Sequence, residues 1–340
     1  MGKYIKLFTV AITIAFLSSG CATKIKVKAL YPSDIDRAAA TKTIAVTEFK
    51  NDTIGVGGTF ETKIASQKLD GKPYFTVISR TNIDQVLKEQ KLQGSGLLDE
   101  SSSVSIGGLL GAQALISGEV GNVSKDDREY YETRSKCVKY NDKKECISYK
   151  KYRVNCVERS VGLNVNIKMV DVSRGDIIYT ESFNKNKHQN HCNDSWGSLL
   201  SQSQMLNQIV DNITTNFAGK LTPRYVFFEV TLLDSPDIDY SDNQKSKLES
   251  GLKLMEKGRY DKAINNFEYL VQSTGERSYV ALYNLGVVQE ALGNLEDALS
   301  LYQNADGLTD DSVDEIYMGI QRVQLTIDKR NKALNQMNRD

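Results

Sequence analysis

The sequence predicts an α/β (α+β) domain, with a mixed sheet packed against helices, followed by an all-α helical array. Two observations lead to this prediction. Short apolar strand-like segments alternate with helix-like segments through roughly the first two thirds of the chain, and these strand signals stop after residue 233. Beyond that point, two stretches align with each other without gaps at a constant offset of 35 residues.

The chain opens with an apolar leader that ends at a cysteine. Two lysines precede the apolar run 7–17, and the small residues 18–20 lead directly to Cys21. This is the pattern of a secretory signal peptide, and the run is too short to span a bilayer comfortably. Because it resembles a bacterial lipoprotein signal, we expect residues 1–20 to be removed and Cys21 to carry lipid chains such as palmitate. The alternative is an ordinary signal peptide with an incidental cysteine.

The residue after the cysteine bears on the location of the protein, and the overall charge bears on its partners. Aspartate at position 22 would resemble an inner-membrane retention signal, whereas this chain has Ala22. We therefore expect a lipid-anchored outer-membrane protein that faces the periplasm, with residues 21–41 as its tether. The formal net charge is zero, so no basic excess points to nucleic acid.

The α/β domain is expected over residues 42–233. Its segments are short, and apolar residues recur at spacings of two in the strand-like segments and of three or four in the helix-like ones. We expect strands at 43–49, 74–80, 114–120, 161–169, 176–183 and 225–233, and helices at 59–69, 81–93 and 196–221.

A polar insertion at about 121–160 holds most of the remaining cysteines. Cys137, Cys146, Cys156 and Cys192 are an even number in an exported chain, which favours disulfides. A two-residue turn at 141–142 would set Cys137 directly opposite Cys146, leaving Cys156 to pair with Cys192. Four cysteines allow three pairings, so the other two stay open.

A metal site is the rival interpretation of this region. The two histidines of the chain, His188 and His191, lie beside Cys192. A Cys/His zinc site is chemically conceivable, but no Cys-x-x-Cys pair supports it. We therefore expect no metal and no cofactor.

Catalytic and phosphate-binding patterns are weak. The glycine-rich loop 55–58 lacks the full dinucleotide-binding spacing and any P-loop lysine. Carboxylates are scattered, and both histidines sit in one loop, so no acid–base pair or nucleophile triad stands out. We expect no catalytic residues and no enzyme activity.

Residues 234–246 are expected to be a linker, and 247–340 to form the helical repeats with a capping helix. The repeated positions combine glycines, alanines and an aromatic residue at matching offsets. They resemble the tetratricopeptide repeat, in which small residues allow close helix packing and the aromatic fills the core between helices. The matched pairs are Gly251 and Gly286, Gly258 and Gly293, Ala263 and Ala298, and Phe267 and Tyr302.

Arrays of this kind bind peptides or helices in a concave groove. If the array has that geometry, a partner groove would include Glu249, Tyr283, Asn284 and Val287. The alternative is that these residues are ordinary helix surface.

The first domain resembles the CsgG family over roughly residues 42–222. The resemblance rests on the lipoprotein leader and four stretches: "KTIAVTEFKN", "YFTVISRTNIDQVLKEQKLQ", "GAQALISGEV" and "VNIKMVDVSRGDIIYTESF". The resemblance implies an α/β fold and a place in the cell envelope. The family takes its name from an outer-membrane lipoprotein that secretes curli subunits, and its periplasmic relatives include an activator of penicillin-binding proteins.

One departure from the family bears on function. A secretion-pore subunit inserts two β-hairpins into the membrane, and one of them would have to come from residues 121–160. Charges fall on both faces of any strand drawn through that segment. A charge that faces lipid at the midplane costs about 2–4 kcal/mol. We expect the fold to be shared and the pore to be absent.

The sequence therefore predicts a non-enzymatic, membrane-anchored periplasmic adaptor or scaffold of an envelope assembly or secretion system. Protein partners would bind the repeat array, and the α/β domain would dock on an envelope machine or form a homo-oligomer. Two alternatives stay open: a CsgG-type secretion pore subunit and an activator of a penicillin-binding protein.

Overall fold

The computed structural model describes residues 23–78, 108 and 110–338, and the chain divides into two compact units. Each unit draws on two parts of the sequence. One contains the described residues up to 29 together with 226–327, and the other contains residues 30–225 with the described residues after 327. The α/β class of the first region and the all-helical C-terminal region are both confirmed.

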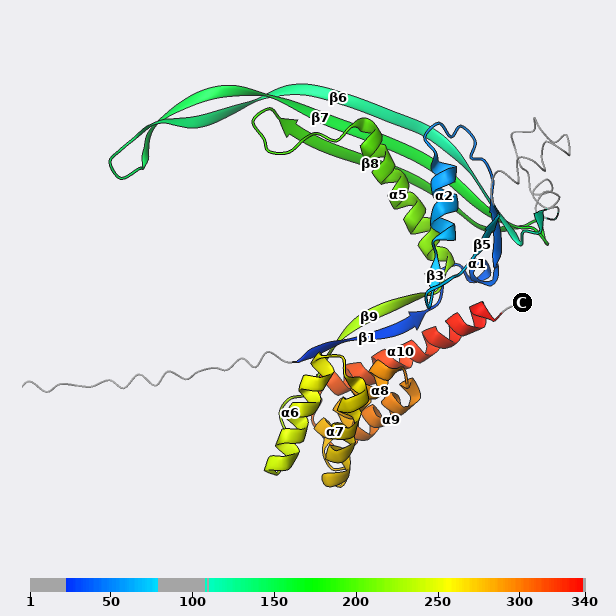
Figure 1. Cartoon of the computed structure of the whole chain (residues 1–340), viewed down its shortest axis with the longest axis vertical. Coiled ribbons are helices and arrows are strands. Elements are labelled where there is room, and N and C mark those ends of the chain that lie inside the picture. Colours follow the sequence, from blue (N-terminus) through cyan, green and yellow to red (C-terminus); the bar gives the residue numbers. More distant parts are fainter. Residues whose placement is uncertain (1–22, 79–107, 109, 339–340) are drawn as a thin grey trace, which may run out of the picture. The chain divides into compact units, whose positions relative to one another are not determined.

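A mixed five-stranded sheet forms the centre of the α/β unit (Figure 1). The strand order is β5–β2–β6–β7–β8, in which β5, β2 and β6 run parallel and β6, β7 and β8 run antiparallel. Its strands are β2 (Thr43–Val46), β5 (Thr76–Ile78), β6 (Ala114–Tyr140), β7 (Cys146–Asp171) and β8 (Ile177–Cys192).

Two helices, α2 (Val56–Ala65) and α5 (Gln202–Leu221), cover one face of this sheet (Figure 1). Side chains alternate between the faces because successive strand residues point in opposite directions. Ile44 and Val46 pack into the core beneath the helices, whereas Ala45 lies in a small cluster on the other face.

Helix α5 begins later than the sequence predicts. Ser201 forms a capping box, in which its hydroxyl accepts from the Gln204 N–H at 3.1 Å and the Gln204 side chain accepts from the Ser201 N–H at 2.8 Å. This box satisfies amides at the start of the helix. The apolar stripe of α5, from Met205 to Leu221, is buried against the sheet.

The expected tether at 21–41 is wrong for most of its length. Strand β1 (Lys24–Tyr31) pairs with β9 (Arg224–Thr231) in a separate two-stranded sheet, and α1 (Asp36–Ala40) follows. The physical reason is the alternation in "KIKVKA", which buries Ile25, Val27 and Ala29 while the lysines between them stay exposed. The remaining short strands are β3 (Lys68–Leu69) and β4 (Lys72–Pro73).

The C-terminal region consists of two helix pairs followed by a long helix (Figure 1). The core of this unit also takes in Ile25, Val27, Val230 and Leu232, so the strand pair β1–β9 contributes to it. The helices are α6 (Asp242–Glu256), α7 (Tyr260–Ser273), α8 (Tyr279–Leu292), α9 (Leu295–Asp306) and α10 (Asp314–Met337).

Some expectations lie outside the described residues. These are the leader, Cys21 and the helix expected at 81–93. Within the described part of the chain, no helix combines the length and the apolar character needed to cross a bilayer.

Candidate functional site

The face of α8 that the sequence assigned to a partner groove is covered by the chain itself. Tyr283, Asn284 and Val287 are buried, so the groove assignment is wrong for these three residues. Glu249 lies on the exposed surface of α6, where its carboxylate is 2.6 Å from the Lys253 ammonium. Two contacts contribute to this burial on α8: residues 231 and 233 hydrogen-bond to Tyr283 and Asn284, and the Tyr283 ring packs against that of Tyr302.

Asn284 holds the segment after β9 with both ends of its amide. The Leu233 N–H donates to Asn284 Oδ1 at 3.1 Å, and Asn284 Nδ2 donates to the Leu233 carbonyl at 2.7 Å. The Tyr283 hydroxyl donates to the Thr231 carbonyl at 2.8 Å. One buried amide therefore satisfies the N–H and the C=O of a single residue, as a neighbouring strand would.

The N-terminus of α8 fixes the far end of the same segment. The Ser278 hydroxyl donates to Asp237 Oδ1 at 2.5 Å, and the Tyr279 N–H donates to Asp237 Oδ2 at 2.7 Å. The Tyr240 hydroxyl lies 2.6 Å from Ser278 Oγ, and burial raises the pKa of Tyr240. A carboxylate at the positive end of the helix dipole is favourable, so this contact closes the segment onto the array.

A buried ion pair joins three helices of the array. The Arg322 guanidinium donates to both carboxylate oxygens of Glu290 at 2.7 Å, and the Tyr302 hydroxyl donates to Glu290 Oε2 at 2.7 Å. Burial raises the pKa of Tyr302 well above its usual value. Each charge has its partner, so this cluster binds α8, α9 and α10 together and leaves no unpaired charge for chemistry.

The repeated small and aromatic residues of the array lie in contact. A Cβ atom on Gly251 would meet Phe267 Cζ at 2.7 Å, and one on Gly286 would meet Tyr302 Cε1 at 2.7 Å. Ala263 and Ala298 are fully buried, and Gly258 and Gly293 adopt positive φ at the helix ends. The identification of these helices as tetratricopeptide repeats remains a prediction.

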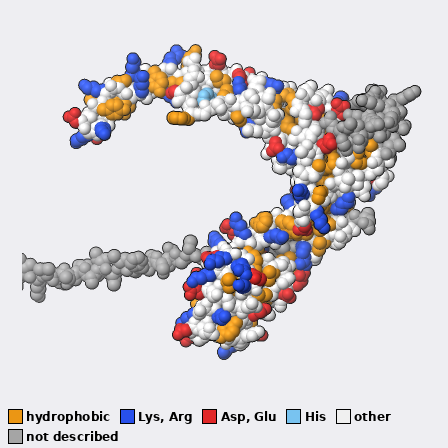
Figure 2. Space-filling view, viewed as in Figure 1, with side chains coloured by type: hydrophobic (Ala, Val, Ile, Leu, Met, Phe, Trp, Pro, Cys, Tyr) orange, Lys and Arg blue, Asp and Glu red, His pale blue; other side chains and the backbone are white. Residues whose placement is uncertain are grey.

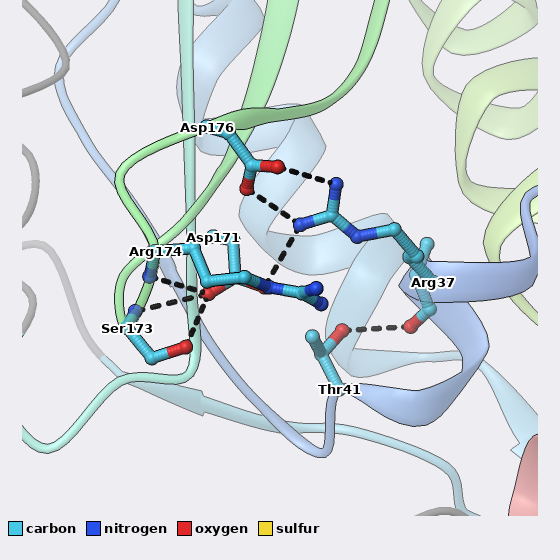
Figure 3. Close-up of polar contacts among 7 residues, drawn as sticks. Arg37, Thr41, Asp171, Ser173, Arg174 and Asp176 are labelled. Carbon is cyan, nitrogen blue, oxygen red and sulfur yellow. Dashed lines mark hydrogen bonds and ion pairs between the residues drawn. The ribbon is translucent and has the colours of Figure 1, made fainter.

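In the α/β unit, a cluster of charged and polar side chains surrounds Arg37 (Figure 3). Its guanidinium donates to Asp176 at 2.6 and 2.9 Å and to Asp171 at 3.0 Å. The other oxygen of Asp171 accepts from the N–H and hydroxyl of Ser173 and from the Arg174 N–H. The "DVSRGD" turn is therefore tied to α1.

The charges of this cluster are balanced within the protein. Burial acts to raise the pKa of Asp171, but hydrogen bonds from Ser173, Arg37 and Arg174 outweigh it and hold the pKa well below its usual value. The hydrogen bond from Arg37 likewise lowers the pKa of Asp176. Two carboxylates with lowered pKa values around one arginine stabilise a turn and are poorly suited to proton transfer near neutral pH.

The glycine-rich loop at 55–58 does not offer its amides to a ligand. Asp52 accepts hydrogen bonds from the Val56 N–H and the Gly57 N–H, both at 2.9 Å. Residues 56–58 belong to the first turn of α2. The carboxylate of Asp52 thus occupies the place at the helix N-terminus where a phosphate would bind.

The polar insertion forms the outer part of a long ribbon made of β6, β7 and β8 (Figure 1). Both expected disulfides are present, Cys137–Cys146 and Cys156–Cys192. Cys156 lies directly opposite Cys192 in the β7–β8 ladder. Along the ribbon, Arg128 pairs with Glu158 and Arg159 with Asp127 across β6 and β7.

The turn that joins β6 to β7 differs from the expected two-residue turn. The connection runs from Asn141 to Glu145, and Asn141 Oδ1 accepts from the Lys143 N–H at 3.0 Å and from the Glu145 N–H at 2.8 Å. The register places Cys146 beside Tyr140, so Cys137 and Cys146 are joined diagonally, with Cα atoms 5.9 Å apart. The pairing expected from the sequence therefore forms through a different turn.

The rival metal site is not formed by these residues. Among the described residues, the single group of close potential ligands is Glu132, Cys156 and Cys192, and its two sulfurs are joined in a disulfide. His188 and His191 pair with Ser160 and Val157 in the ladder, so they lie on opposite faces of β8. A thiolate-based site at Cys192 is therefore ruled out in this oxidised form.

Sequence reasoning missed Asp237 and Arg37, and it assigned Asn284 to a partner groove instead of to the chain's own backbone. These three residues act across long sequence separations, which no local periodicity reveals. Only the turn leaves a signal in the sequence. An aspartate that accepts hydrogen bonds from the residue two positions later is typical of turns, as Asp171 does from Ser173.

Comparison with known proteins finds a family model that matches part of this chain. Residues 33–196 match the family model "Curli production assembly/transport component CsgG". None of the curated proteins gives a significant match.

Among solved structures, lipoprotein GNA1162 from Neisseria meningitidis is similar at 14% identity and a TM-score of 0.29, covering 52% of this chain and 99% of that one. A PelC dodecamer from Paraburkholderia phytofirmans is similar at 14% identity and a TM-score of 0.24, covering 58% of this chain and 97% of that one. A second crystal form of the PelC dodecamer gives 12% identity, a TM-score of 0.22 and coverages of 58% and 98%.

Proposed function

Because residues 33–196 match the model of the CsgG family, we propose that this chain is a membrane-anchored periplasmic lipoprotein that acts as an adaptor or scaffold in an envelope assembly or secretion system. The family match is the observation that carries the proposal. The leader and Cys21 supply the expected anchor, and no catalysis, metal or cofactor is assigned.

The lipid anchor is tested first. The Cys21→Ala chain, expressed with its leader intact, should move from the outer-membrane fraction to the soluble periplasmic fraction. The wild-type chain should carry the added mass of its acyl chains on the N-terminal peptide, measured by mass spectrometry. A chain that stays in the membrane without Cys21 would contradict lipid anchoring.

In this proposal, the helical array binds its protein partner through α10, because the residues of α8 first assigned to the groove are buried. On α10, Tyr317, Met318 and Leu325 are 57%, 60% and 48% exposed, and Tyr317 and Leu325 share one face of the helix. Large exposed apolar side chains grouped on one helix are typical of interaction sites. We assign the protein partner of the array to this face.

A photo-crosslinking amino acid at position 317 tests this surface in intact cells. It should trap a distinct envelope protein, whereas the same group at the exposed Asn304 of α9 should not. Equal trapping at both positions, or none at 317, would contradict the adaptor role of the array.

A secretion pore subunit is the second candidate, and the length of the ribbon favours it. Strands β6 and β7 contain 27 and 26 residues, more than the roughly 9–11 that a membrane strand needs. The ionic side chains along the ribbon argue against its burial in the hydrocarbon core of a bilayer. The native mass of the lipidated chain in mild detergent separates the two: a large, closed and dissociation-resistant oligomer favours the pore, and a monomer or small oligomer favours the adaptor.

A further inference from the structure

The free end of the β6–β7 ribbon is a surface that neither the family match nor the fold accounts for. Strand β8 pairs with β7 only as far as Cys156, and beyond this point β6 and β7 continue as a two-stranded hairpin. We call residues 136–151 at the end of this hairpin the ribbon tip. Figure 1 shows the tip well away from the helices α2 and α5 that cover the sheet.

The ribbon tip is strongly basic. Its lysines are Lys136, Lys139, Lys143, Lys144, Lys150 and Lys151, against the carboxylates of Asp142 and Glu145. The Lys136 ammonium lies 5.7 Å from the centre of the Tyr152 ring. In the region that the structure describes, the other five lysines form no ion pair, so their charge is available to an anionic ligand.

Apolar side chains are exposed among these lysines. Val138, Tyr140, Ile147 and Tyr149 are 51%, 61%, 54% and 67% exposed. Figure 2 shows hydrophobic and basic side chains interleaved at the end of the ribbon. A purely basic surface could bind any polyanion. A surface that mixes basic and apolar side chains instead favours a ligand with both an anionic and an apolar layer.

The shape of the tip is fixed in advance. The Cys137–Cys146 disulfide joins its two strands, and the side chain of Asn141 braces the connecting loop through the N–H groups of Lys143 and Glu145. A surface that is already ordered loses less conformational entropy on binding.

The composition of the tip distinguishes a membrane from a protein as its ligand. Lysine is depleted from the cores of protein–protein interfaces. By contrast, tyrosine concentrates at the boundary between headgroups and acyl chains, and lysine is attracted to anionic lipids. We propose that the ribbon tip docks on the surface of a bilayer that contains anionic phospholipid, with its lysines at the phosphates and Tyr140 and Ile147 in the interfacial layer.

This docking is peripheral and involves no membrane-spanning strand. The docking proposal uses one part of the proposed function, namely that the chain lies near a membrane. A second membrane contact would reinforce the lipid on Cys21, because stable anchoring commonly combines two signals.

The test uses the full chain with Cys21→Ala, exported so that both disulfides form, and measures its co-sedimentation with vesicles. It should bind vesicles of phosphatidylcholine mixed with phosphatidylglycerol, bind poorly to phosphatidylcholine alone, and dissociate as salt increases. Adding Lys143→Glu and Lys144→Glu should lower binding by about tenfold or more, since each basic residue near an anionic surface contributes about fivefold.

A matched control reverses two exposed lysines of the array, Lys257→Glu and Lys262→Glu, with the same change in net charge. It should bind as the parent does. A third variant, Tyr140→Ser with Ile147→Ser, should reduce binding without altering its dependence on salt.

The proposal is overturned if the parent fails to bind anionic vesicles, or if the tip and control variants bind equally. It is also overturned if a crosslinker at Tyr149 traps an acidic protein while vesicles show no binding. The parent chain carries Cys21→Ala, so its binding to vesicles does not depend on lipid attachment. Lipid anchoring and docking of the ribbon tip can therefore fail separately.

Discussion

At the scale of single residues, polar side chains that join distant segments decide how the chain is held together. Asn284 pairs with the backbone of Leu233, Asp237 caps α8, and Arg37 neutralises two carboxylates. Asn284 is fully buried and satisfies backbone groups that would otherwise be costly to leave unpaired. Its replacement should therefore affect stability more than the loss of an average hydrogen bond.

Asn284→Ala should destabilise the helical unit. It removes the partner of the Leu233 N–H and of the Leu233 carbonyl, and a buried unsatisfied polar group costs about 1–3 kcal/mol. Urea unfolding followed by circular dichroism at 222 nm measures the change. Asn304→Ala, at an exposed position on α9, is the control and should unfold like the wild type. An unchanged midpoint for Asn284→Ala would show that the segment after β9 does not depend on this clamp.

Asp171 should make the stability of the α/β unit depend on pH. Its pKa is lower in the folded chain than in the unfolded chain, so its ionised form stabilises the fold above the ordinary carboxyl pKa of about 4. This contribution is lost as the pH falls further toward the folded-state pKa. Asp171→Asn should reduce stability at pH 7 and flatten the decline below pH 4, measured by thermal unfolding from pH 7 to pH 2. Parallel curves for the two chains would contradict this role.

At the scale of elements, helix packing in the array depends on glycine facing an aromatic ring. Gly286 on α8 and Gly251 on α6 allow Tyr302 and Phe267 to approach the helix backbones. The resemblance to the tetratricopeptide repeat implies that these small residues allow close packing and that these aromatic residues fill the core. By contrast, the ribbon extends much further than the strands expected at 114–120 and 161–169, because β6 and β7 continue to pair through the polar insertion.

Gly286→Ala should destabilise the array although alanine is the better helix former. The new methyl group would lie 2.7 Å from Tyr302 Cε1, and overpacking of this kind typically costs about 1–3 kcal/mol. Gly219→Ala on α5 is the matched control, since nothing lies within 4 Å of its added Cβ. The control should raise stability by up to about 1 kcal/mol. Thermal unfolding of both variants tests the contrast, and stabilisation by Gly286→Ala would refute the proposed close packing.

At the scale of the whole molecule, the domains are not continuous in sequence. The sequence places a boundary in a linker at 234–246, with the array beginning at 247. In the structure, the array core also contains Tyr240, Val230 and Leu232, together with Ile25 and Val27 from the start of the described chain. The unit is therefore closed by segments more than 200 residues apart in sequence.

A fragment of residues 241–340 should consequently fold poorly. It lacks the apolar side chains of β1 and β9 and the segment that covers Tyr283 and Asn284 on α8. Each lost buried side chain removes roughly 1.5–3 kcal/mol of hydrophobic stabilisation. Circular dichroism should show reduced helicity and a broad thermal transition compared with the full chain. A sharp transition at the temperature of the full chain would show that the helices are sufficient alone.

The sequence by itself determined the α/β class, the helical C-terminal region and the family resemblance, and it favoured the disulfide pairing that the structure has without excluding the other two. These follow from periodicity, from an even number of cysteines behind an expected leader and from short motifs, all of which are local signals. Only the tertiary structure decided that β1 replaces a tether, that Asn284 binds the chain's own backbone, and that the ribbon tip gathers unpaired lysines. The reason is that these features depend on which distant segments meet, and on which charges find partners once they do.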